Sequence, residues 1–292
     1  MRRVRWFAWA LVVPCLLFVR PTTGQTVEPQ TMVGKPLYLR GLWASDKLEF
    51  DSEGQLVGDA KVGPLTLSGI DVQHANVDGK QLFIRGQRVA LIADSEGRLQ
   101  RQVIVSRTHI FGSLRRGDAK NFKANEEINI TVHADGSGSF EVALRAIFAD
   151  GLADLSKTVP KYWRCYADGY FAKSLAPDAA KSTVEACVRE HSLAPWTEAT
   201  GRGNFVGPKL VETTPPPFTR EAAELGVSGV SRVHFTVSKH GIAVGFQVVQ
   251  AVGAGLDEAT LTAVSQYHFQ PATSDGVAVN ADSDFSMNYT TQ

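Results

Sequence analysis

Alternation of apolar and polar residues dominates the first half of the chain. Between residues 30 and 150, short segments rich in Val, Ile, Leu and Phe are separated by polar or glycine-bearing turns. Such alternation is typical of strands that bury one face, and short turns favour antiparallel hairpins over helical crossovers. The predicted strands are LYLRGLW (37–43), KLEFD (47–51), PLTLSGIDV (64–72), KQLFIRG (80–86), RVALIA (88–93), RQVIVS (101–106), INITVHA (128–134) and SFEVALRAIF (139–148). We therefore expect a mostly antiparallel β domain of unknown function, built as a sandwich, roll or barrel.

A short motif occurs twice in this region, as DSEGQL (51–56) and DSEGRL (94–99). Its carboxylates offer the oxygen ligands that calcium prefers, but neither copy has the dense, regular spacing of a calcium loop. Asp, Ser and Gly are also the residues that a tight turn needs, for side-chain capping and for positive φ. The motif therefore predicts two hairpin turns.

Residues 151–196 form a different kind of segment, rich in aromatic residues and followed by a helical pattern. One hypothesis is an exposed cluster that stacks on sugar rings or lipid; the other, which we favour, is a small core that packs on the β domain. The aromatic residues are Tyr162, Trp163, Tyr166, Tyr170 and Phe171.

The helical pattern covers residues 176–191, with Pro177 suited to its first turn and apolar residues recurring on one face. That face includes Cys187 and turns it towards Cys165. The expected result is one structural disulfide, which closes a loop of 21 intervening residues and contributes about 3 kcal/mol. Two free buried thiols are the alternative. A metal site is disfavoured, because neither cysteine belongs to a CxxC pair.

Residues 197–217 mix Gly, Thr and Pro, lack sustained periodicity and end in three prolines, which predicts a linker. The remaining residues, 218–292, predict a compact αββαβ unit. A short helix ends near Gly226, and two alternating segments meet at a glycine turn in VHFTVSKHGIAVGFQVV (233–249). A helix with Asp257 as its N-cap follows, and the chain closes on the strand DFSMNY (284–289). The overall class is therefore α+β.

This C-terminal unit resembles the C-terminal domain of the TonB energy-transducer family over residues 208–292. The resemblance rests on the order of the proline run, the short helix, the glycine turn, the leucine–aspartate helix start and the YHFQPA sequence (267–272). The chain departs from the family pattern at Phe218-Thr219, where the family has tyrosine-proline. It also has Tyr267-His268-Phe269 where tryptophan-arginine-phenylalanine is usual.

The resemblance implies a docking function rather than catalysis. Domains of this family accept a short segment of an outer-membrane transporter as an added strand, so backbone hydrogen bonds at a sheet edge provide affinity. By this resemblance, the partner-binding strand consists of Phe285, Ser286, Met287, Asn288 and Tyr289. The alternative is that this strand is only a component of the sheet, with its edge covered by the N-terminal region.

The N-terminus indicates export. A basic start precedes an apolar run of 14 residues, Trp6–Val19, and small residues follow near Gly24. This pattern predicts a signal peptide over 1–24 and a periplasmic location, because the run is shorter than the roughly 20 residues of a comfortable membrane span. The alternative is a short inner-membrane anchor facing the periplasm, through which the chain contacts motor proteins. However, the run contains no Ser or His to couple with a proton-driven motor.

Charge and motifs narrow the function further. Removal of residues 1–24 leaves 26 basic against 30 acidic residues, and no basic patch stands out, so we expect no nucleic-acid partner. The chain has no GxSxG, HExxH, P-loop or GxGxxG motif, and we expect neither an enzyme nor a cofactor or metal site. Two hypotheses about function remain. The first is a TonB-like docking protein, with or without energy transduction. The second is a secreted β-rich protein that binds glycan, peptidoglycan or lipid and uses the C-terminal unit for protein docking.

Overall fold

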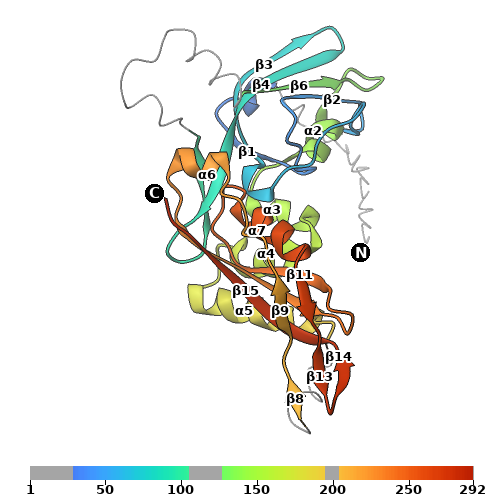
Figure 1. Ribbon diagram of the computed structural model, residues 1–292. Coiled ribbons are helices and arrows are strands. Elements are labelled where there is room, and N and C mark those ends of the chain that lie inside the picture. The colour runs from blue at the N-terminus through green and yellow to red at the C-terminus, as the bar shows by residue number, and fades with distance from the viewer. Residues whose placement is uncertain (1–28, 105–126, 195–203, 292) are drawn as a thin grey trace, which may run out of the picture.

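The computed structural model describes residues 29–104, 127–194 and 204–291. The predicted signal peptide over 1–24 lies outside these ranges. Within them, no helix has the length and apolar character needed to span a membrane. The N-terminal strands form the upper part of the molecule in Figure 1, and the helices of the middle region and the C-terminal elements lie below them. The chain has the predicted α+β class.

Seven strands form the N-terminal sheet. They are β1 (Pro36–Leu39), β2 (Lys47–Phe50), β3 (Gly69–Asp78), β4 (Gln81–Ala93), β5 (Leu99–Val103), β6 (Glu127–His133) and β7 (Phe148–Ala149). Their order is β2-β6-β4-β3-β1-β7, with β5 paired to the far end of β4. Every pair is antiparallel except β2 with β6, which is parallel. The predicted strands at 80–86 and 88–93 are a single long strand, β4.

Three predicted strands of this region are wrong in part. In the segment 37–43, strand β1 ends at Leu39 and a turn follows. The other two segments are partly helical. The segment 139–148 is mostly helix α2 (Glu141–Ile147), because its apolar residues Ala143, Leu144 and Ile147 are buried on one helical face while Val142 stays exposed. The segment 64–72 begins with a 3-10 turn at Leu65–Leu67 before β3 starts. In both cases a short apolar run fits either periodicity, and the packing decides between them.

The two DSEG motifs are hairpin turns, as predicted. In each, the aspartate Oδ1 accepts hydrogen bonds from the backbone N–H groups two and four residues later, at 2.8–2.9 Å. Gly54 and Gly97 take positive φ values of 81° and 80°. Asp135 organises a third turn in the same way. The carboxylates of Asp51 and Asp94 therefore hold their own backbone turns.

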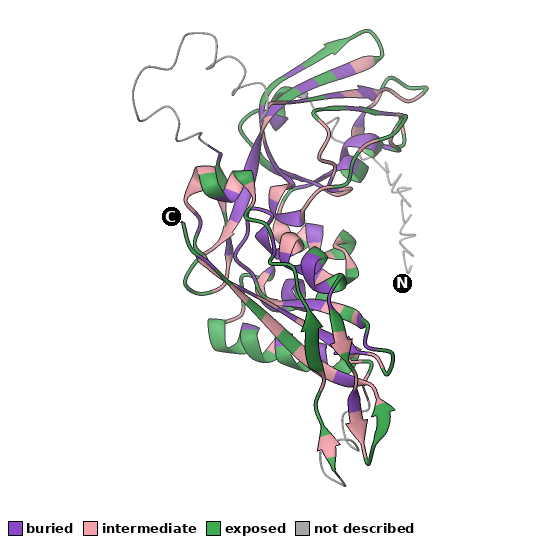
Figure 2. Cartoon of the chain, viewed as in Figure 1, coloured by how far each residue is buried: buried purple, intermediate pink, exposed green. Residues whose placement is uncertain are grey.

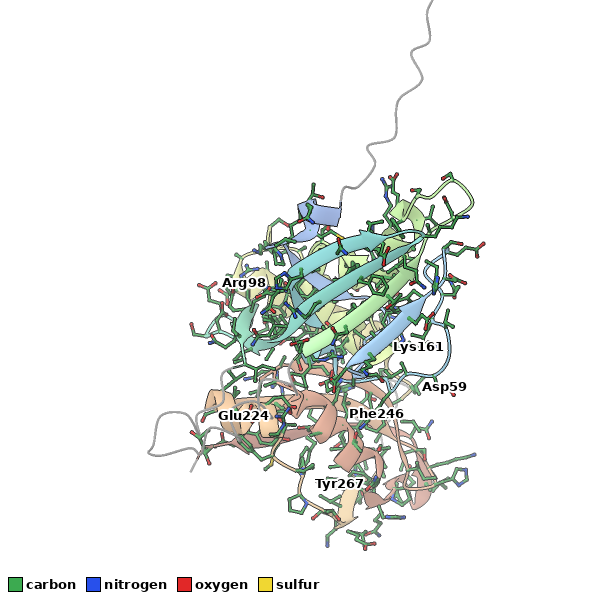
Figure 3. The ribbon with its side chains drawn as sticks, turned by 90° about the horizontal axis from the view of Figure 1, so that it is seen from above. Asp59, Arg98, Lys161, Glu224, Phe246 and Tyr267 are labelled. Atoms are coloured by element: carbon green, nitrogen blue, oxygen red, sulfur yellow. A yellow bond between two sulfur atoms is a disulfide. The ribbon has the colours of Figure 1, made fainter. Side chains whose placement is uncertain are left out.

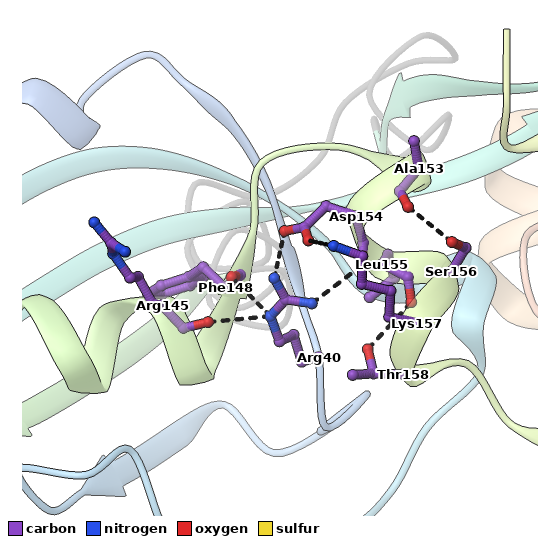
Figure 4. Close-up of polar contacts among 9 residues, drawn as sticks. All are labelled: Arg40, Arg145, Phe148, Ala153, Asp154, Leu155, Ser156, Lys157 and Thr158. Atoms are coloured by element: carbon purple, nitrogen blue, oxygen red, sulfur yellow. Dashed lines mark hydrogen bonds and ion pairs between the residues drawn. The ribbon is translucent and has the colours of Figure 1, made fainter. Parts of the chain in front are cut away.

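Arg40, directly after β1, connects the N-terminal sheet to the helices (Figure 4). Its Nε donates to the carbonyl oxygens of Arg145 and Phe148 at 3.1 and 3.0 Å, at the end of α2. Its Nη1 donates to the Asp154 carbonyl at 3.2 Å, and Nη2 forms an ion pair with the Asp154 carboxylate in α3 (Leu152–Leu155). The Arg40 guanidinium therefore links β1 of the sheet to the end of α2 and to α3, where the helical segment begins.

The helical segment is stapled by the predicted disulfide, Cys165–Cys187. It contains 3-10 turns at Ser156–Thr158 (η4) and Lys161–Trp163 (η5), then α4 (Arg164–Tyr170) and α5 (Pro177–His191). The predicted face of α5 is buried. Three of the five aromatic residues, Trp163, Tyr166 and Phe171, are buried, and the Tyr166 ring contacts the other two edge to face. Tyr162 and Tyr170 are half-buried against the same core. This burial opposes the hypothesis that the cluster stacks on sugar or lipid.

The C-terminal part follows the predicted αββαβ order with short additions. Its main elements are α6 (Arg220–Leu225), β10 (Gly229–Val237), β11 (Ala243–Gln250), α7 (Leu256–Ser265) and β15 (Ala281–Tyr289). Three short strands, β12 (His268–Gln270), β13 (Ala272–Ser274) and β14 (Val277–Val279), lie between α7 and β15. The described part of the predicted linker holds β8 (Phe205–Val206) and β9 (Lys209–Glu212), which pair with β13 and β12.

One apolar core joins all three parts of the chain. Leu91 of the N-terminal sheet, Trp163 of η5 and Phe235 of β10 belong to the same buried cluster. Figure 2 shows buried residues continuing from the upper sheet through the central helices into the lower strands. The backbone also connects them, since Ala254 N–H donates to the Leu91 carbonyl at 2.9 Å. The aromatic cluster is thus part of the central core, larger than the local core predicted.

Candidate docking edge

Strand β15 is the last element of the C-terminal sheet, whose order is β11-β10-β15. It pairs with β10 over nine residues in unbroken antiparallel register, from Gly229↔Tyr289 to Val237↔Ala281. Within the described ranges, no strand pairs with its other side. Figure 1 shows β15 as the long strand that ends at the C-terminus. One edge of this strand therefore has its backbone N–H and C=O groups without a strand partner.

The side chains of β15 alternate between two faces, as the sequence pattern predicts. Ala281, Phe285 and Tyr289 face the core, and the even-numbered residues between them face away from it. Phe285 packs edge to face on Tyr267 at 5.5 Å between ring centroids, and Tyr289 does the same with Phe218 at 5.7 Å. Figure 3 shows Tyr267 among the C-terminal elements, on the side away from the N-terminal sheet. The strand is thus fixed through one face.

The five predicted binding residues are not equivalent. Ser286 and Asn288 are exposed, and Phe285 and Met287 are half-buried. Tyr289 is buried, and its hydroxyl lies 2.9 Å from Thr260 Oγ1 and donates to the Leu256 carbonyl at 3.3 Å. Burial raises the pKa of Tyr289 to about 12. Tyr289 therefore anchors the end of β15 in the module, and the accessible part of the predicted strand is 285–288.

Two acidic residues that the sequence analysis did not select lie at the start of β15. Asp282 accepts hydrogen bonds from Ser192 Oγ at 2.6 Å and from Thr236 Oγ1 at 2.8 Å. Asp284 contacts His234 Nδ1 at 3.2 Å, and this hydrogen bond holds the pKa of the Asp284 carboxyl below its usual value. The sequence DSDFS carries a recognisable signal, because acids at alternate positions of an edge strand share one face.

The end of the helical segment is hydrogen-bonded to the face of the sheet that carries Asp282. Ser192, the residue after α5, bonds Asp282, and the Leu193 N–H donates to Thr236 Oγ1 at 3.3 Å. A side chain at Gly245 of β11 would meet Leu193 at 3.1 Å. The helical segment therefore contacts the β11-β10-β15 sheet beside β15 without pairing with the edge of that strand.

The segment before α6 packs against the same face of the C-terminal sheet that carries Phe285 and Tyr289. Tyr267 donates from its hydroxyl to the Thr214 carbonyl at 2.9 Å, and Pro216 is buried. Thr219 caps α6, since its Oγ1 accepts from the Ala222 N–H. Three consecutive prolines carry no N–H group, so residues 215–217 cannot donate ladder hydrogen bonds to a neighbouring strand.

Helix α7 supports the sheet and begins with two acids, of which Asp257 is buried and Glu258 is half-buried. The predicted N-cap, Asp257, lies one residue inside the helix, and Gly255 is the N-cap. The Asp257 carboxylate accepts from the N–H groups of Val252 and Gly253 and from Ser231 Oγ, at 2.7–3.3 Å. Burial nevertheless raises its pKa to about 6. Asp257 thus organises the loop between β11 and α7 rather than the helix terminus.

Comparison with protein-family models agrees with the resemblance. Residues 214–291 match the family model described as Gram-negative bacterial TonB protein C-terminal, which confirms the TonB C-terminal domain predicted over this part of the chain. Among solved structures, the chain is similar to the "Solution NMR structure of Pseudomonas aeruginosa TonB CTD", with 20% identity. That match covers 32% of this chain and 94% of the other, with a TM-score of 0.25. No curated protein matches the chain.

Proposed function

We propose, from the match of residues 214–291 to the TonB C-terminal family, that this chain is a periplasmic docking protein that binds an outer-membrane transporter by strand addition at β15. The observation that carries the proposal is the open edge of β15, nine residues long and held rigidly on its other side by β10. An edge of this length supplies several backbone hydrogen bonds to an extended segment in one continuous ladder.

The surroundings of β15 support this use. Its core face is anchored by Phe285 and Tyr289, so the strand keeps its place while a partner segment binds or leaves. The proline run lies near the core side and cannot donate to the ladder. The edge of β15 is therefore open to a partner strand, while the core-facing side chains of the strand hold it in place.

Docking is the function that we assign first, and energy transduction is its extension. The module shares one core with the N-terminal sheet, so a force applied at β15 would act on the whole described body. Transmission from inner-membrane motor proteins requires in addition that residues 6–19 remain as an anchor. N-terminal sequencing of the exported protein separates the two cases: a start near Gln25 leaves docking alone.

Site-specific photocross-linking tests the docking proposal with the full chain. A photoreactive residue at Ser286, exposed on β15, should cross-link to the N-terminal segment of an outer-membrane transporter in outer-membrane extracts. The matched control carries the same group at Lys80, exposed in the turn between β3 and β4. The proposal is wrong if adducts form equally at both positions or if no transporter is captured at Ser286.

A further inference from the structure

The open edge of β15 offers a partner two distinct rows of side chains. Because side chains of a strand alternate, an added strand would place its own residues alternately beside the core-facing row and beside the outer row. The core-facing row contains Ser283, Phe285 and Met287. The outer row contains Asp282, Asp284, Ser286 and Asn288. These rows set the chemistry that the partner must match.

A partner strand would best match the core-facing row with apolar side chains. Phe285 and Met287 are only half-buried, although both belong to apolar clusters of the module. Their remaining exposed surface lies along a strand whose other neighbour, β10, contributes the buried Val233 opposite Phe285. Apolar residues at every second position of the partner would cover this surface, and the flexible Met287 side chain can adapt to their shape.

The outer row carries one accessible charge. Asp282 is already engaged by Ser192 and Thr236, and its side chain is only 16% exposed. Asp284 is 59% exposed; His234, which forms an ion pair with it when protonated, and the charged Arg232 both lie on the β10 side. On the side of Asp284 that faces the open edge, the described residues place no neighbouring strand. Ser286 and Asn288 complete the row with neutral polar groups.

We propose that the β15 edge selects an extended segment with apolar side chains at alternate positions and a lysine or arginine in the row beside Asp284. This inference rests on the proposed function, since it names the chemistry of the segment that docks there. A basic residue beside Asp284 gains a cross-strand ion pair, and an acidic residue at that position faces a like charge. Asp284 therefore determines specificity, while the backbone ladder provides most of the affinity.

The test measures binding of synthetic peptides to the full chain by fluorescence anisotropy. Each peptide has nine residues, capped ends and valine at alternate positions, with threonine at the others. One threonine at a time is replaced by Lys, Gln or Glu, so that the position beside Asp284 is found by scanning. At that position we expect affinity in the order Lys, Gln, Glu, with about a two- to fivefold change per step.

Variants at Asp284 decide whether this residue is the cause. Asp284→Asn should remove most of the preference, and Asp284→Lys should reverse it, so that the Glu peptide binds best. The control is Asp59→Lys, which changes the net charge equally at an exposed N-terminal position (Figure 3) and should preserve the order. Thermal unfolding checks that each variant is folded.

The outcomes separate this inference from the proposed function. Peptides that bind the chain equally whatever their charge, or an order that Asp284→Lys leaves unchanged, would overturn the charge selection and leave strand addition intact. Failure of every peptide to bind would overturn both. An order that Asp59→Lys changes as strongly as Asp284→Lys would show a general charge effect and would also contradict the inference.

Discussion

Trp163 donates a hydrogen bond of 2.9 Å from its indole Nε1 to Oε1 of Glu258 in the first turn of α7. The same oxygen accepts the Leu65 N–H at 2.8 Å. A single carboxyl group therefore joins the N-terminal sheet region, the helical segment and the C-terminal unit. Its other oxygen, Oε2, is shielded from solvent and has no hydrogen-bond partner among the described residues. Burial and the neighbouring Asp257 raise the pKa of Glu258 to about 7.

Stability should fall as the pH rises from 3.8 to about 7, because Asp257 and Glu258 bind protons more tightly in the folded chain than in the unfolded one. In this window the folded state holds more protons, so raising the pH favours unfolding, by up to about 3 kcal/mol per group. At pH values well below this range, both carboxyls are protonated in the folded and in the unfolded chain, so they no longer make stability depend on pH. Denaturant unfolding between pH 4 and 8 measures it.

Glu258→Gln identifies the part of this slope that comes from Glu258. The amide oxygen can still accept from Trp163 and Leu65, but the side chain no longer ionises. The variant should match the wild type near pH 4 and be more stable at pH 8. Glu212→Gln, at a side chain that is 78% exposed, is the control and should leave the slope unchanged. Parallel profiles of the wild type and Glu258→Gln would contradict this assignment.

Loss of the Arg40 side chain should destabilise the corner between the sheet and the helices. Arg40→Met removes hydrogen bonds to Arg145, Phe148 and Asp154 from a side chain that is 18% exposed. We expect a loss of about 2 kcal/mol, because carbonyl groups near the end of α2 lose their donor. The measurement is the free energy of unfolding in urea.

Arg145→Met provides a matched control in the same region. Arg145 is 77% exposed, and among the described residues its side chain pairs with Glu141, one turn earlier, at 2.5 Å. An exposed pair of this kind contributes about 0.3–0.5 kcal/mol. Equal losses for the two variants would show that Arg40 has no special role at this corner.

The disulfide should stabilise the chain through the loop it closes. Cys165 and Cys187 are 22 positions apart, and the double substitution to serine should lower stability by about 3 kcal/mol. A reducing agent should shift the wild type to the midpoint of the double variant and leave that variant unaffected. If the reductant has no effect on the midpoint of the wild type, the bond does not contribute as expected.

Local patterns predicted the elements of this fold better than the contacts between them. The face of α5, the Cys165–Cys187 pair and the strand ending at Tyr289 were all predictable, since each depends on periodicity within a short segment. Helix α2 was not, because EVALRAI fits both strand and helix until Ile147 is packed. The Glu258 junction was also out of reach: its partners lie 95 and 193 residues away in the sequence.

The candidate site shows the same division. The resemblance pointed to 285–289, but the structure buries Tyr289 and brings Asp284 to the accessible edge. Side-chain alternation alone places Asp284 on the outer face. Only the pairing of β15 with β10, from a segment some 50 residues earlier, shows which edge is open.

Backbone hydrogen exchange of β15 tests strand addition most directly. In the free full chain, the amides of β15 that point away from β10 should exchange rapidly, and those that point towards β10 slowly. Binding of a transporter segment should slow exchange of the outward amides, at about every second position between Ala281 and Asn288. A segment that binds while these amides continue to exchange rapidly, with protection appearing only elsewhere in the chain, would contradict docking at this edge.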